Sequence, residues 1–181
     1  MLEVPWELNW RFSKVSTRLF GDYAQNLNGS QRAEAAFNAS RKAFQPINTA
    51  GIATISSPQT DDIHAYQAGI AVGTRDCLGL MDGSICRKHA WEFRTYWQRV
   101  EQYALDVNLI DSDFFEGRAN LQGVVAALSY GFTDNILGTV RYGYATRINN
   151  KLGTGGSNQD IPQMNPIARY NILQVDLAFE F

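Results

Sequence analysis

Residues 172–181 of the chain read ILQVDLAFEF, and this stretch decides the fold. A β-strand sends successive side chains to opposite faces of a sheet, so strict alternation predicts a strand with one apolar and one polar face. Acidic side chains at positions 176 and 180 exclude burial of both faces. Two structures fit such a strand, a soluble sandwich and a membrane-spanning β-barrel. The apolar members of the alternation are Leu173, Val175, Leu177, Phe179 and Phe181.

Six segments upstream show the same period of two, so the sequence predicts an all-β protein with about seven strands. A long insertion at 26–62 separates two of them, and its Ala-, Arg- and Lys-rich part at 31–44 predicts a short helix. The predicted strands lie at 6–12, 17–25, 64–73, 91–100, 120–132, 137–147 and 172–181.

The composition limits the class of protein. With 181 residues the chain has the length of one domain, 1–181, and a net charge of −2 gives no field that would attract nucleic acid. There is no run of about 18 apolar residues, which a membrane-spanning helix would need. The absence of such a run does not exclude a transmembrane barrel, because apolar and polar residues alternate along its strands and the mean hydropathy of each strand is low. The N-terminal residues lack the basic region and apolar core of a signal peptide.

The lengths of the connections favour the barrel over the sandwich. The connections at 13–14 and 133–135 are short, whereas those at 26–62, 101–118 and 149–166 are long. Outer-membrane barrels have short periplasmic turns and long outer loops, and this chain follows that rule if its last residue lies at the periplasmic rim. The connection at 74–89 is the exception, a long periplasmic turn.

In this barrel, alternation assigns each strand residue to lipid or to the lumen. The predicted membrane-facing residues are Trp6, Leu8, Trp10, Trp91, Phe93, Trp97, Tyr142, Tyr144, Leu173, Val175, Leu177, Phe179 and Phe181. The predicted pore-lining residues are Glu7, Arg11, Arg18, Asp22, Glu92, Arg94, Gln98, Arg141, Arg147, Asp176 and Glu180. Charges in a dry core would be very costly, so these side chains are expected to line water. Ion pairs that pack a closed lumen are the alternative.

Several pieces of the chain resemble the bacterial "putative porin" family of Gram-negative outer-membrane proteins. They are Leu19 to Tyr23 followed by Asn26, Trp91 to Glu101, Asp111 to Phe114, and the C-terminal strand from Leu173 to Phe181, in that order. The resemblance covers nearly the whole chain and implies the C-terminal part of a larger transmembrane antiparallel up-and-down β-barrel. The helix at 31–44 and the two-cysteine turn depart from the family pattern.

Seven strands would not close a barrel. Single-chain bacterial barrels have even numbers of strands from eight upward, and an open sheet edge in lipid leaves backbone groups unpaired. We therefore expect further strands from upstream sequence or from another chain. Met1 is then an internal start or a gene-model boundary.

The two cysteines and the acidic loop leave alternatives open. A disulfide between Cys77 and Cys86 would staple the 74–89 turn in the periplasm, with two free thiols as the alternative. Their spacing, with His89 nearby, is not that of a zinc site. Asp111, Asp113 and Glu116 lack the ligand spacing of an EF-hand, which favours a solvated acidic loop over a calcium site.

No catalytic constellation is predicted. His64 and His89 are the only histidines, and a membrane-spanning strand would separate them, so neither could serve Ser129 in a triad. The expected function is passive diffusion of small hydrophilic solutes or ions through a charged lumen, without enzyme activity or cofactor. A non-conducting barrel that acts as adhesin or scaffold through its outer loops is the alternative, and an enzyme barrel comes third.

The expected location is the outer membrane of a Gram-negative bacterium. The expected partners are outer-membrane lipid, small hydrophilic solutes and the barrel-assembly machinery, which would recognise the C-terminal strand. Association of several copies remains an open alternative, and no nucleic-acid partner is expected. Replacement of Arg94 or Arg141 by Glu should change the ion selectivity of such a pore.

Overall fold

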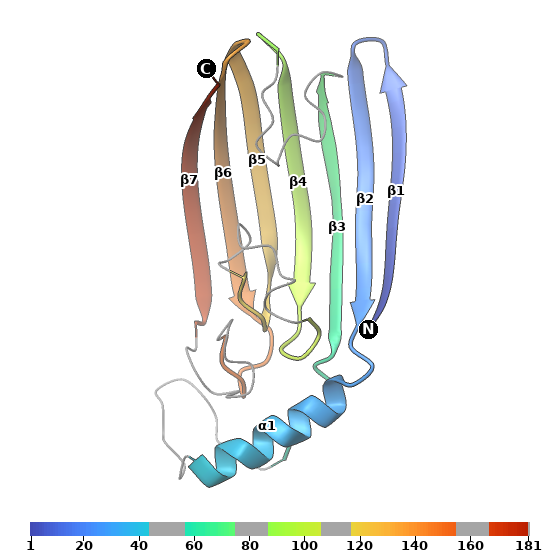
Figure 1. Ribbon diagram of the computed structural model, residues 1–181, viewed down its shortest axis with the longest axis vertical. Coiled ribbons are helices and arrows are strands. Elements are labelled where there is room, and N and C mark those ends of the chain that lie inside the picture. The colour runs from blue at the N-terminus through green and yellow to red at the C-terminus, as the bar shows by residue number, and fades with distance from the viewer. Residues whose placement is uncertain (44–56, 75–86, 106–116, 155–166, 181) are drawn as a thin grey trace.

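The computed structural model describes residues 1–43, 57–74, 87–105, 117–154 and 167–180, which form one antiparallel sheet with a helix at one end (Figure 1). The seven strands follow one another in chain order, each hydrogen-bonded to the next. This up-and-down topology and the short helix confirm the predicted all-β architecture. The elements are β1 (Leu2–Phe12), β2 (Val15–Gln25), α1 (Gly29–Ala43), β3 (His64–Thr74), β4 (Trp91–Val100), β5 (Leu121–Thr133), β6 (Ile136–Arg147) and β7 (Arg169–Phe179).

Some strand and helix boundaries differ from the prediction. β1 begins at Leu2, four residues before the predicted start at Trp6, and includes Pro5. β2 begins at Val15, which pairs with Phe12 across the two-residue turn. α1 begins two residues before the predicted 31–44 and ends one residue earlier. A register shift after Gly131 extends β5 to Thr133 and shortens the following turn.

The connections are sorted by length between the two ends of the sheet. The turns Ser13–Lys14 and Asp134–Asn135 lie at the end where β7 finishes, which we call the turn end (top of Figure 1). The connections at 26–63, 101–120 and 148–168 leave the opposite end, where α1 lies, and we call this the loop end. The predicted sorting is confirmed, and the β3–β4 connection at the turn end is the predicted exception.

The strand register divides the side chains between two faces, because directly paired residues project to the same side of a sheet. In β5, Val125, Ala127 and Ser129 are buried, whereas Val124 and Leu128 on the opposite side are nearly half exposed. The buried face is crowded by its own side chains, as expected for the concave side of a curved sheet. We call it the inner face and the other the outer face.

Apolar packing on the inner face is concentrated toward the loop end. Tyr96, Leu121, Val125 and Ala145 form one buried cluster, with Phe20 and Tyr170 packed against it. The described part of the chain has no helix that is long and apolar enough to cross a bilayer.

Candidate functional site

The outer face is mainly apolar over all seven strands, and its polar row lies near the loop end, where Arg99 pairs with Gln122. In β7 its side chains are strongly exposed, with Leu173, Val175 and Leu177 at 70%, 67% and 60%. The register continues this surface through Tyr142, which pairs with Leu173, to the tryptophans of β4 and β1. Trp6, Leu8, Trp10, Trp91, Phe93, Trp97, Tyr142, Tyr144, Leu173, Val175, Leu177 and Phe179 all lie on this face, and Phe181 lies outside the described residues.

The inner face collects the polar residues that the sequence predicted for a pore. The register brings together residues from five strands, and Glu180 follows β7 in the same alternation. The members are Glu7, Arg11, Arg18, Asp22, Glu92, Arg94, Gln98, Arg141, Arg147, Asp176 and Glu180. One curved surface therefore carries charges of both signs, facing away from the apolar side.

Ion pairs on this face link residues of the same strand or of adjacent strands. The guanidinium of Arg94 donates to Glu92 Oε1 from Nε at 3.1 Å and from a terminal nitrogen at 3.0 Å, and both side chains are largely buried. Arg18 lies 3.7 Å from Glu7 across the β1–β2 ladder, where Glu7 is about half exposed. The buried pair is held in a defined geometry, whereas the exposed pair contributes about 0–1 kcal/mol.

Phe20 lies on the charged inner face and connects two arginines. The Cζ atoms of Arg18 and Arg94 lie 5.3 Å and 5.8 Å from the centre of the Phe20 ring. Such cation–π contacts attract a guanidinium group to the face of an aromatic ring. The far edge of the ring rests on Gly69, where a Cβ atom would lie only 2.7 Å from Phe20 Cζ. Phe20 shares the inner face with Glu7, with which it pairs, and its contact with the two arginines was not predicted from the sequence.

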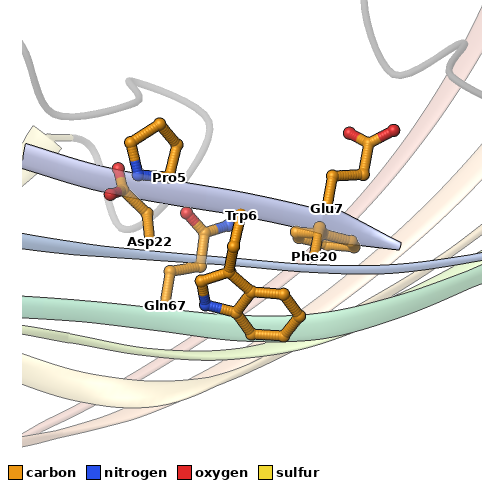
Figure 2. Close-up of a pocket in the computed structure, with 7 residues that line it drawn as sticks. Pro5, Trp6, Glu7, Phe20, Asp22 and Gln67 are labelled. Carbon is orange, nitrogen blue, oxygen red and sulfur yellow. The ribbon is translucent and has the colours of Figure 1, made fainter. Parts of the chain in front are cut away.

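A hollow of about 300 Å³ opens beside Glu7 at the β1 side of the sheet. Figure 2 shows Glu7 and Trp6 of β1 pointing to opposite sides of the ribbon, with Asp22 and Gln67 nearby. The Trp6 indole lies against Gly21, so closely that a Cβ atom at Gly21 would lie 2.4 Å from the ring. This edge therefore combines a polar inner rim with an aromatic outer surface.

The long connections pack together into a structure that we call the loop-end cap, made of α1 and residues 57–63, 101–105, 117–120 and 148–154. Ala33 and Ala36 of α1 contact Tyr103 and Leu152, and these residues are buried. Ala104 and Ala119 also cover inner-face residues at the loop end, including Val100, which is fully buried. The cap thus lies partly over the inner face.

Polar side chains hold the parts of the cap together. Asn120, with a left-handed backbone (φ 59°), donates from Nδ2 to the carbonyl oxygens of Asn149, Leu152 and Gly153. Asn149 Nδ2 donates to the Asp62 carboxylate at 2.6 Å. Burial raises the pKa of the Asp62 carboxyl above its ordinary value, the Asn149 hydrogen bond opposes this rise, and nearby Glu101 adds to it.

The remaining predicted features either lie apart or fall outside the described residues. His64 begins β3 at the loop end and bonds Tyr23, whereas His89 lies near the turn end beside Tyr130. Ser129 bonds Thr139. Among the described residues, no group of three or more His, Cys, Asp or Glu side chains could hold a metal ion. Cys77, Cys86, Asp111, Asp113 and Glu116 lie outside the described residues.

A comparison with protein-family models decides the family. A model described as "Putative porin" matches residues 1–181, the whole chain. The chain belongs to this family. A search of curated proteins and a search of solved structures gave no match. Membership confirms the resemblance drawn from the sequence motifs, and the family's description indicates a membrane location and a porin role.

Proposed function

We propose that this chain is part of an outer-membrane porin, a passive diffusion channel for small hydrophilic solutes or ions. The observation that carries the proposal is the separation of polar and apolar side chains between the two faces of one curved sheet. An exposed apolar surface that extends over seven strands is far larger than a soluble monomer usually has, and it suits contact with acyl chains. The charged inner face would then line water.

The proposal includes further strands along β1 and β7, each of which has a single neighbour in the sheet. In hydrocarbon, an unpaired strand edge leaves backbone groups without hydrogen bonds at a cost of several kcal/mol per group. Additional strands, from the same polypeptide or from a second copy, would remove this cost. The turn end would face the periplasm and the loop-end cap the exterior, in keeping with the usual loop lengths of such barrels.

No chemical step and no cofactor belong to the proposed function. Its partners would be outer-membrane lipid at the outer face, solutes at the inner face and the barrel-assembly machinery at the C-terminal strand.

Single-channel recording of the full-length protein in a planar bilayer tests the proposal. We expect discrete, ohmic current steps from protein whose folding has been verified by heat-modifiable migration in gels. Folded, inserted protein that carries no current would overturn the porin function and favour the adhesin or scaffold alternative, in which the loop-end cap would be the functional surface.

A further inference from the structure

Three arginines occupy one row of directly paired residues across the inner face. Arg18 pairs with Ala71, Ala71 with Arg94, Arg94 with Ala127, and Ala127 with Arg141. Asn9 and Gln174 complete the row at β1 and β7. None of the seven strand residues in this row, all of them described, is acidic.

The spacing lets the guanidinium groups approach each other. Strands lie about 4.8 Å apart, so arginines on every second strand have Cα atoms about 10 Å apart, which their long side chains can bridge. The residues between them, Ala71 and Ala127, are small and buried, and leave the space above the sheet to the arginines. The ring of Phe20 lies within 6 Å of the guanidinium carbons of both Arg18 and Arg94, which holds these two groups near each other.

Arg18 and Arg94 have N–H groups beyond those that face Glu7 and Glu92. Arg94 directs two of its nitrogens to one oxygen of Glu92, Oε1, whereas a guanidinium has five N–H donors. The contact between Arg18 and Glu7 is long, at 3.7 Å. Arg18 Nε is buried and has no hydrogen-bond partner in the described structure. A buried donor of this kind calls for an acceptor.

We propose that the arginine row, defined as Arg18, Arg94 and Arg141, is a binding site for small solutes that carry an oxyanion group, and that it makes the channel anion-selective. This inference rests on the proposed porin function and adds the solute class to it. The planar guanidinium fork matches the oxygens of both carboxylate and phosphate groups. Glu92, whose Oε1 accepts from two nitrogens of Arg94, is a positioning residue for that guanidinium.

Reversal potentials of the full-length protein in a potassium chloride gradient test the selectivity. We expect the wild type to prefer chloride, and a variant with all three row arginines changed to Gln to have an anion-to-cation permeability ratio about tenfold lower. Lys14→Gln, which removes one positive charge from the exposed turn between β1 and β2, should leave the ratio nearly unchanged. A channel that conducts with the same ratio in wild type and triple variant would overturn the inference and leave the porin function standing.

Binding measured without current separates the two proposals further. Calorimetry of the detergent-folded full-length protein should give saturable heat with succinate or with inorganic phosphate, and none with the triple variant. Heat with succinate alone identifies carboxylates as the solute class, and heat with phosphate alone identifies phosphates. Saturable binding in a protein that carries no current would overturn the porin function only, whereas the absence of binding of both ions would overturn the arginine site.

Two further variants separate loss of binding from loss of folding and test the role of the guanidinium shape. Arg94→Gln removes a positively charged partner of buried Glu92. The double variant E92Q/R94Q keeps the local charge balanced, so it should fold while binding the anion weakly. Arg94→Lys keeps the charge but lacks the planar fork. Binding by R94K as tight as that of the wild type would contradict the proposed guanidinium geometry.

Discussion

Asn120 and Asn149 hold each other through two hydrogen bonds. Asn120 Nδ2 donates to the Asn149 carbonyl oxygen at 2.9 Å, and the Asn149 backbone N–H donates to Asn120 Oδ1 at 2.8 Å. These bonds join the residue before β5 to the connection after β6. Two of the long connections therefore form a single structure over the loop end, rather than separate loops.

Replacement of Asn120 should loosen the cap without unfolding the sheet. Asn120→Ala loses all the side-chain hydrogen bonds, and the buried groups left unpaired cost about 1–3 kcal/mol. Alanine also tolerates the left-handed backbone of this position less well than asparagine does. Limited proteolysis should cut the cap of the variant much faster than that of the wild type. Asn120→Gly, which accepts this backbone, is the matched control and isolates the hydrogen-bond contribution.

The cleavage rates of the two variants separate the hydrogen bonds of Asn120 from its backbone conformation. If N120A and N120G are both cleaved at the wild-type rate, the hydrogen bonds of Asn120 do not hold the cap. If only N120A is cleaved faster, the backbone conformation is the cause.

The packing of the cap should depend on pH through Asp62. Its pKa is raised in the folded protein, so the folded state takes up a proton more readily than the unfolded state. The stabilising contribution is therefore present at pH values below its ordinary pKa and is lost as pH rises through the raised one. Hydrogen exchange of the cap amides, corrected for intrinsic rates, should show more protection at acid pH.

The variant Asp62→Asn isolates this effect. It removes the titrating group, while the amide oxygen of Asn can still accept the hydrogen bond from Asn149. The contribution of residue 62 to the pH dependence should disappear. An identical pH profile in D62N would show that another group controls the cap.

The glycine under Phe20 should tolerate no side chain. A Cβ at Gly69 would lie 2.5 Å from Tyr96 Cβ and 2.7 Å from the carbonyl oxygen of Thr95, which is backbone and cannot move aside. We expect Gly69→Ala to destabilise the sheet by about 1–3 kcal/mol, measured by urea unfolding in detergent micelles. Gly138→Ala is the control, because its shortest contact is with the movable ring of Phe132. Equal stability of the two variants would contradict this packing.

The two faces of β7 should respond in opposite ways to charge. Leu173 lies on the outer face and its neighbour Ile172 on the inner face, so an arginine at either position tests the assignment directly. We expect Leu173→Arg to reduce insertion into lipid vesicles, with a cost up to about 2–4 kcal/mol near the bilayer centre. Ile172→Arg should insert like the wild type. Insertion of L173R at the level of I172R would contradict a lipid-facing outer surface.

The sequence by itself determined which side chains share a face. Strict alternation in β7, and similar alternation in the other strands, is a local property, so the predicted inner and outer sets could be derived without knowing any pairing. The lengths of the connections could also be predicted from the sequence, and so could their sorting between the turn end and the loop end. The family resemblance rested on motifs of the same local kind.

Only the tertiary structure decided which residues lie opposite one another. A shift of one residue would move an entire strand's side chains to the other face, and a shift of two would break the row of Arg18, Arg94 and Arg141 while leaving each arginine on the inner face. The observed register includes a shift after Gly131, and it pairs Phe20 with Gly69. The cap bonds of Asn120 also join residues distant in sequence, and no local pattern encodes such contacts.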